Sequence, residues 1–111
     1  MKRRFDLYLK DILESIKRIK EYSENEEKSE MIKVDAILRN LEIIGEASTQ
    51  IPNEIKSRHK NIPWRDIQDF RIIVAHHYWK INLERVWDIV ENKLPILEKQ
   101  IKELLKKEKS I

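Results

Sequence analysis

Apolar residues recur along this chain at steps of three and four positions, which is the period of an amphipathic α-helix. Over about residues 2–22 they form one continuous stripe: Phe5, Leu9, Ile12, Ile16, Ile19 and Tyr22. A polar, acidic stretch at residues 23–29 interrupts the period and predicts a loop. The period resumes over about residues 30–50, with inward positions at Ile37, Leu38, Leu41, Ile44, Ala47, Ser48 and Ile51. The pattern therefore predicts two long helices, each with one buried face.

The second half of the chain predicts shorter helices separated by proline and asparagine. One runs from Asn53 to about His59, the next from Pro63 to about His77, and another begins at Leu83. Pro95 lacks the N–H that would bond back to Glu91, so we expect a kink or a new helix start there.

Side-chain oxygens at helix starts identify the predicted N-caps, which are Ser29, Asn53, Asn61 and Asn82. The chain has one glycine and three prolines, too few for the turns of a β-rich fold. The predicted fold class is all-α: an antiparallel bundle of four to five helices in a single domain, residues 1–111.

Gly45 lies in the middle of the second predicted helix and is the only glycine. A glycine there costs about 1 kcal/mol relative to alanine. We interpret it as a point where another backbone approaches closely.

Composition and charge narrow the class of protein. Apolar residues make up 41% and charged residues 39%, and the longest uncharged apolar run, residues 72–75, is far below the ~20 residues of a membrane span. There is no cysteine and no apolar signal segment at the N-terminus, so we expect a soluble, cytoplasmic protein without membrane partners. Residues 1–20 carry seven basic and three acidic groups, a patch that could attract RNA but also has the composition of an ordinary solvated surface.

The candidate chemistry lies in residues 62–78, where Arg71, His76 and Tyr78 form an Arg-x4-His-x-Tyr pattern. A guanidinium can bind a phosphate through two hydrogen bonds, and an imidazole transfers protons near neutral pH. A helix turns by about 100° per residue, so Arg71 and His76 lie about 140° apart around its axis. A joint site therefore needs either a helix end near His76 or a second copy of the chain, which a symmetric dimer supplies. We expect that dimer to bury the surface near residues 74–75 and the helix face beside Gly45.

Other readings of these residues stay open. An arginine and a histidine five positions apart occur by chance in many helices. No His-Glu-x-x-His motif, carboxylate cluster or glycine-rich phosphate loop is present, so neither a metal nor a cofactor is expected. Trp64, Trp79 and Trp87 are more typical of a core or an interface than of base-stacking platforms.

Three segments in order resemble one known family: residues 39–47 (RNLEIIGEA), residues 63–67 (PWRDI) leading into the Arg71-x4-His76-x-Tyr78 motif, and residues 86–90 (VWDIV) through Leu94-Pro95. The chain resembles HepT-like proteins, HEPN-domain toxins that are paired with a minimal nucleotidyltransferase antitoxin of the MntA type.

The resemblance implies a HEPN-like bundle that dimerises through the motif-bearing helices. It implies a metal-independent endoribonuclease toxin in which Arg71 and His76 of both subunits form one composite cleft. It also implies that the nucleotidyltransferase partner silences the toxin by attaching AMP to Tyr78. The chain departs from the family pattern at Ile72, where a polar residue is usual, and at residues 69–70, which are often Gly-Met.

Two alternative functions follow from these departures and from the charge pattern. Ile72 favours a non-catalytic helical partner, regulatory or substrate-binding, of a nucleotidyltransferase. The basic N-terminus favours a simple RNA-binding module.

Overall fold

A computed structural model describes residues 3–76 and 82–109, with the backbone alone at residues 75, 76 and 109. This part of the chain is helical apart from short connections and contains no strand. The elements are α1 (Phe5–Glu24), α2 (Glu30–Thr49), α3 (Asn53–Arg58), α4 (Trp64–Gln68), α5 (Phe70–His76), α6 (Leu83–Asp88), a π-helical turn η1 (Ile89–Lys93) and α7 (Leu94–Lys109). The predicted all-α fold class is confirmed.

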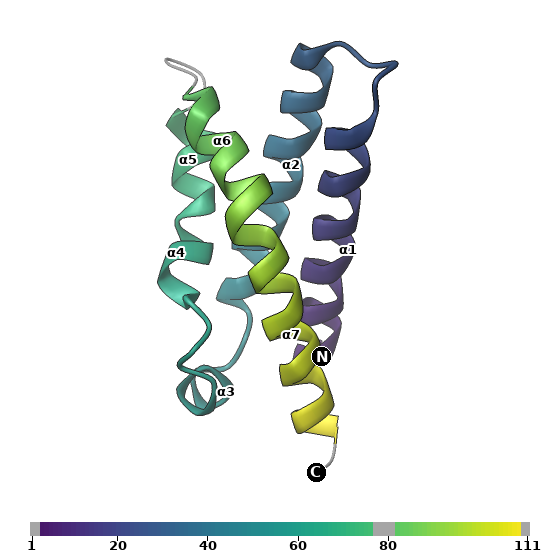
Figure 1. Cartoon of the computed structure of the whole chain (residues 1–111). Coiled ribbons are helices and arrows are strands. Elements are labelled where there is room, and N and C mark those ends of the chain that lie inside the picture. The colour runs from purple at the N-terminus through teal and green to yellow at the C-terminus, as the bar shows by residue number, and fades with distance from the viewer. Residues whose placement is uncertain (1–2, 77–81, 110–111) are drawn as a thin grey trace.

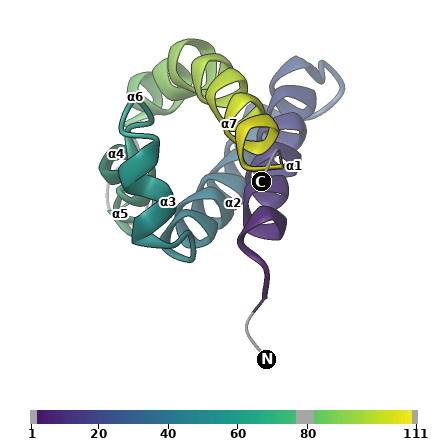
Figure 2. The ribbon, with the colours of Figure 1, turned by 90° about the horizontal axis from the view of Figure 1, so that it is seen from below.

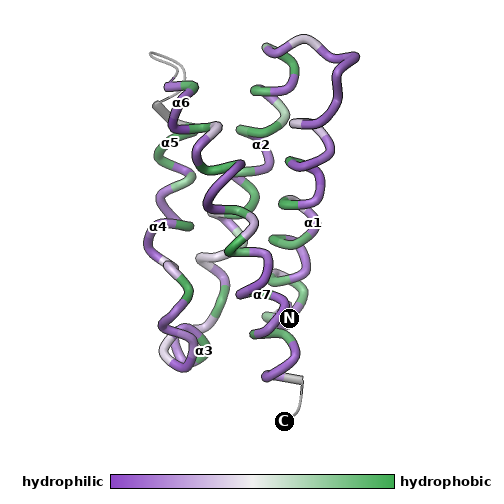
Figure 3. The backbone as a smooth tube through the Cα atoms, in the orientation of Figure 1, coloured by the Kyte–Doolittle hydropathy of each residue, from purple (hydrophilic) through white to green (hydrophobic). Residues whose placement is uncertain are grey.

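The two long helices, α1 and α2, run antiparallel and form the main packed pair of the bundle (Figure 1). Their apolar stripes are buried against each other and the rest of the core, at Leu9, Ile12, Ile16 and Ile19 of α1 and Ile37, Leu41 and Ile44 of α2. Hydrophobic and hydrophilic residues alternate along these helices at helical intervals (Figure 3). Each buried Leu or Ile stabilises the fold by about 1.5–3 kcal/mol, so the stripes that predicted the helices also hold them together.

The shorter helices pack on the two sides of this pair. Helices α4 and α5 lie against α2, on the side away from α1, while α7 lies against α1 (Figure 2). Helix α6, the turn η1 and α7 follow one another as a nearly continuous rod (Figure 1). Among residues 3–76 and 82–109, no helix is long and apolar enough to cross a membrane.

Two of the four predicted N-caps are confirmed. The Ser29 side chain accepts a hydrogen bond from the Ile32 N–H, and the Asn82 side chain accepts one from the Arg85 N–H at 3.1 Å. The predictions for Asn53 and Asn61 are wrong, because the N-cap positions of α3 and α4 are Pro52 and Pro63. In each helix the carbonyl of that proline accepts the first helical hydrogen bond. Asn53 is therefore the first residue of α3, and Asn61 lies two residues before the N-cap of α4.

The helix expected from Pro63 to about His77 is divided at Asp69. Asp69 N–H still bonds to the Arg65 carbonyl at 3.0 Å, but the Asp69 carbonyl then accepts a tight hydrogen bond from Ile72 N–H at 2.9 Å. The next residue, Phe70, begins α5. The motif helix is therefore the short α5.

The new helix start expected near Pro95 is confirmed, since α7 begins at Leu94. The π-helical turn η1 precedes it, and the Leu94 N–H bonds to the Ile89 carbonyl five residues back. Such a wider turn shifts the hydrogen-bond register by one residue. The helix can therefore continue past Pro95, which has no N–H to donate.

Candidate functional site

Gly45 of α2 is a point of close approach between α2 and α5. A Cβ atom built on Gly45 would lie 2.6 Å from Arg71 Cγ, 3.3 Å from Arg71 N and 3.4 Å from the Ile67 carbonyl oxygen. Only glycine admits this packing without a shift of α5 or of the Arg71 side chain. The interpretation of Gly45 as a site of close approach is confirmed, but the approach occurs within one chain. The surface at Gly45 itself is filled by α5, and the expected burial of the neighbouring part of α2 by a second copy stays a prediction.

Arg71 rests its stem on Gly45 and holds its guanidinium at the surface. Its Nε donates to the Gln68 carbonyl at 3.4 Å, and its Nη1 lies 3.6 Å from Glu46 Oε1 on α2. The side chain remains 43% exposed. Charge-assisted hydrogen bonds are normally about 2.7–2.9 Å long, so neither contact is a strong one. The arrangement fixes where the guanidinium lies but leaves it able to exchange partners.

His76 is the last residue of α5, and α5 is uninterrupted from Phe70 to His76. Helix geometry therefore separates the backbone positions of Arg71 and His76 by about 140° around α5, so one copy of α5 does not present both on one face. The His76 side chain and the whole of Tyr78 lie outside the described residues. Ile72, next to Arg71, is 53% exposed, and Val74 is half-buried.

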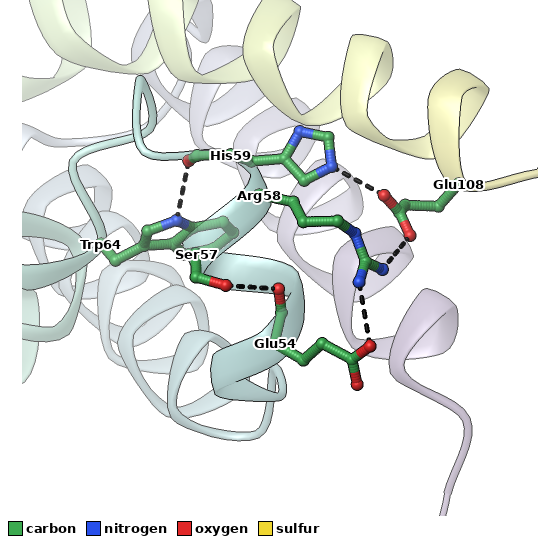
Figure 4. Close-up of polar contacts among 6 residues, drawn as sticks. All are labelled: Glu54, Ser57, Arg58, His59, Trp64 and Glu108. Carbon is green, nitrogen blue, oxygen red and sulfur yellow. Dashed lines mark hydrogen bonds and ion pairs between the residues drawn. The ribbon is translucent and has the colours of Figure 1, made fainter.

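A second polar cluster, which the sequence did not reveal, joins α3 to α7 (Figure 4). Arg58 Nη2 donates to Glu108 Oε1 at 2.7 Å, and His59 Nε2 lies 2.8 Å from Glu108 Oε2. Arg58 also bonds Glu54 at 3.1 Å, and Trp64 Nε1 donates to the His59 carbonyl at 3.1 Å. We call Arg58, His59 and Glu108 the clasp.

Glu108, the acidic residue of the clasp, is shielded from solvent. The Glu108 side chain is only 9% exposed, and its hydrogen bonds from Arg58 and then His59 lower the pKa of its carboxyl below the ordinary value. The clasp lies at the end of the bundle that holds α3 and the C-terminal end of α7, opposite the end at which α5 terminates (Figure 1). The charged groups of the clasp form hydrogen bonds with one another, as is typical of a contact that stabilises the fold.

Two arginines of the basic N-terminus, Arg3 and Arg4, pair with neighbouring carboxylates. Arg3 pairs with Asp11 at 2.6 Å and also lies over the Tyr8 ring, 4.7 Å from its centroid. Arg4 pairs with Asp6 at 2.8 Å. These pairs reduce the net positive field that a polyanion would meet there. Among the side chains that the structure describes, no group of three or more His, Asp or Glu residues is arranged to hold a metal ion.

Comparison with known proteins gives one consistent family. The model of the family described as "Ribonuclease HepT-like" matches residues 10–104. A "Putative RNase" of Caldanaerobacter subterraneus subsp. tengcongensis is 37% identical over 106 residues, which cover 92% of this chain and 95% of that protein. A "Probable ribonuclease HepT" of Thermococcus cleftensis is 35% identical over 114 residues, which cover 96% of this chain and 100% of that protein. No solved structure matches the chain.

Proposed function

The chain belongs to the HepT-like ribonuclease family, and we propose that it is a toxin that cleaves RNA without a metal ion and works as a homodimer. The observation that carries the proposal is the setting of Arg71. Its stem is packed on Gly45, while its guanidinium is exposed and only loosely paired with Glu46. A guanidinium held in this way can take a phosphate through two hydrogen bonds at little rearrangement cost.

In the proposed reaction, the RNA 2′-oxygen attacks the adjacent phosphorus while His76 of one copy accepts the 2′-hydroxyl proton. The bond from phosphorus to the 5′-oxygen breaks, and His76 of the other copy donates a proton to that leaving oxygen. Arg71 binds the phosphate and offsets the negative charge that develops on its oxygens. The products are a 2′,3′-cyclic phosphate and a 5′-hydroxyl, so atoms and protons balance.

The homodimer is supported by the geometry of α5. Arg71 and His76 are separated by about 140° around one helix, so two copies of α5 side by side would bring an arginine of one next to a histidine of the other. Light scattering should report a dimer at micromolar concentration, and a stable monomer would contradict the proposed cleft.

Tyr78 is the proposed site of control. In the proposed inhibition, a MntA-type nucleotidyltransferase transfers AMP from ATP to the Tyr78 hydroxyl, with pyrophosphate as the leaving group. The new phosphodiester adds about one negative charge close in sequence to Arg71 and His76, where it would compete with RNA for the guanidinium. Intact mass and peptide mapping after co-expression should show AMP on Tyr78 and none on the Tyr78→Phe variant. An adduct on Tyr8 or Tyr22 instead would refute this site.

The alternative is a non-catalytic partner of a nucleotidyltransferase, and the exposed Ile72 favours it because polar residues are usual there in the family. A binding module that uses the basic N-terminus is less supported, since Arg3 and Arg4 are both paired with carboxylates. Under either alternative, loss of His76 should leave the activity of the protein largely unchanged.

The clasp offers a matched control for the test of catalysis, because it contains the same two residue types at the other end of the bundle. Arg71→Ala and His76→Ala should each reduce RNA cleavage by about 100-fold or more and remove growth inhibition. Arg58→Ala and His59→Ala should leave cleavage in place. Cleavage is measured on total cellular RNA with and without EDTA. Activity that persists in both motif variants, or that EDTA abolishes, would remove the proposed mechanism.

A further inference from the structure

Glu46 is placed to act on the proposed site, although the proposed reaction does not use it. It follows Gly45 in α2 and therefore lies at the edge of the contact between α2 and α5. Its Oε1 is 3.6 Å from Arg71 Nη1, and its side chain is 60% exposed. No other residue of α2 forms an ion pair with Arg71 among the described side chains.

Three contacts restrain Arg71 at three points along its length. Gly45 receives Cγ, the Gln68 carbonyl accepts from Nε, and Glu46 attracts the terminal nitrogen Nη1. A free arginine side chain has high rotamer entropy, much of which it loses when it binds a ligand in one geometry. Restraints that exist before RNA arrives reduce that loss and favour one orientation of the guanidinium plane.

The long contact between Glu46 and Arg71 can orient the guanidinium without binding it tightly. At 3.6 Å it is longer than the 2.7 Å hydrogen bond between Arg58 and Glu108. The Glu46 carboxylate is solvated and holds the guanidinium only weakly, so an incoming phosphate can bind the guanidinium beside it. Glu46 therefore attracts the guanidinium toward one side without making a pair that is costly to break.

We propose that Glu46 is a positioning residue of the ribonuclease site, which aligns the Arg71 guanidinium for the scissile phosphate. The inference rests on the proposed function and on the role of Arg71 in it. Glu46 acts through Arg71 and does not touch the reacting atoms.

The chain provides a matched control one turn earlier on the same helix. Glu42 Oε1 lies 3.6 Å from Arg39 Nη1, the same separation as between Glu46 and Arg71, and both partners are also exposed. That pair lies within α2 and does not involve α5. Loss of Glu42 therefore removes the same charge from the same helix without changing the restraint on Arg71.

The experiment measures kcat and KM on a mixed-sequence RNA oligonucleotide that carries a fluorophore and a quencher, with thermal unfolding of each variant alongside. Glu46→Ala should lower kcat by about tenfold and leave KM almost unchanged, because a misaligned guanidinium still finds the phosphate but aligns less often with the transition state. Glu46→Gln keeps the acceptor oxygen and should recover part of the loss. Glu42→Ala should match the wild type.

Three results would overturn the proposal. A lower KM with unchanged kcat in Glu46→Ala would mean that the carboxylate competes with the phosphate. Equal losses in Glu42→Ala and Glu46→Ala would indicate a general charge effect, and a lower unfolding midpoint without a kinetic change would indicate a purely structural role. Arg71→Ala separates these from failure of the proposed function: if that variant still cleaves RNA, the function is wrong, whereas if only Glu46→Ala is neutral, the positioning role is wrong.

Discussion

Arg58 and Arg71 are almost equally exposed, at 41% and 43%, and each meets a carboxylate from another helix. The difference lies in the carboxylate. Glu108 is 9% exposed and only 2.7 Å from Arg58, whereas Glu46 is 60% exposed and 3.6 Å from Arg71. When one partner of a short, shielded ion pair is removed, the other charge is left poorly solvated. In a long, solvated pair, either charge can replace its partner with water or a ligand at little cost. Exposure of the arginine alone therefore does not distinguish the clasp from the candidate site.

The two arginines also differ in which part of the side chain is held in place. Arg71 lies on a glycine that admits its stem, so its backbone and stem are fixed while its head is loose. Arg58 has its head fixed by two acids, Glu54 and Glu108. The arrangement of Arg71 suits a site that must receive a ligand, because its guanidinium is free to take a new partner. The arrangement of Arg58 suits a contact that joins distant segments.

The strongest test of this contrast makes the same substitution at both arginines. Arg71→Lys keeps the charge but loses the planar fork, so RNA cleavage should fall by about 100-fold with the unfolding midpoint unchanged. Arg58→Lys should leave cleavage unchanged and lower the midpoint, because one ammonium does not reproduce the geometry of both carboxylate contacts. Paired cleavage and thermal unfolding assays check this, and equal losses of cleavage in the two variants would contradict it.

Glu108→Ala should lower the free energy of unfolding by about 1–2 kcal/mol, because hydrogen bonds to charged groups contribute about that much and His59 loses its acceptor. RNA cleavage should not change, since the clasp is far from the end of α5. Urea unfolding measures the loss. The exposed Glu103 on the same helix provides the control, and Glu103→Ala should have almost no effect.

The clasp also predicts a pH dependence of stability. The pKa of the Glu108 carboxyl is lowered in the folded protein, chiefly by Arg58, so its stabilisation is present above the pKa of the unfolded chain. It is lost as the pH falls through the lower pKa of the folded state. Wild type should therefore be more stable than Glu108→Gln at pH 7, and the difference in unfolding free energy should begin to narrow as the pH falls below the ordinary glutamate pKa of about 4.3. A gap that stays constant from pH 7 to about pH 3 would contradict the ion pair.

Gly45→Ala should change stability least. Alanine gains about 1 kcal/mol of helix propensity, but its Cβ would lie 2.6 Å from Arg71 Cγ, so the net loss should stay within about 1 kcal/mol. In an Arg71→Ala background the clash with Cγ is gone and the 3.3 Å approach to the backbone nitrogen of residue 71 remains, so the same substitution should cost less than in the wild type. A double-mutant cycle of unfolding free energies measures the coupling. Equal effects in both backgrounds would show that the contact with Arg71 is unimportant.

Much of the candidate site could be predicted from the residues of the chain, but its supporting contacts could not. Arg71, His76 and Tyr78 follow from the motif and its resemblance, and Gly45 from its unusual place in a helix. Glu46 lies in the family-like segment 39–47, but its residue type assigns it no role, because an exposed glutamate on a helix usually does nothing specific. Its relation to Arg71 requires the register of α2 against α5, which Gly45 makes possible and the fold then sets.

The helices follow from the order of residues alone, because the period of three to four residues that buries a stripe is a local property of the chain. The caps at Ser29 and Asn82 and the new start before Pro95 are equally local, since each depends on hydrogen bonding within one turn. The contact of His59 with Glu108, 49 residues away, and the seating of Arg71 on Gly45 come from the packing of separate helices. Many registers of packing satisfy the same apolar stripes, and the side chains at the contact select one of them.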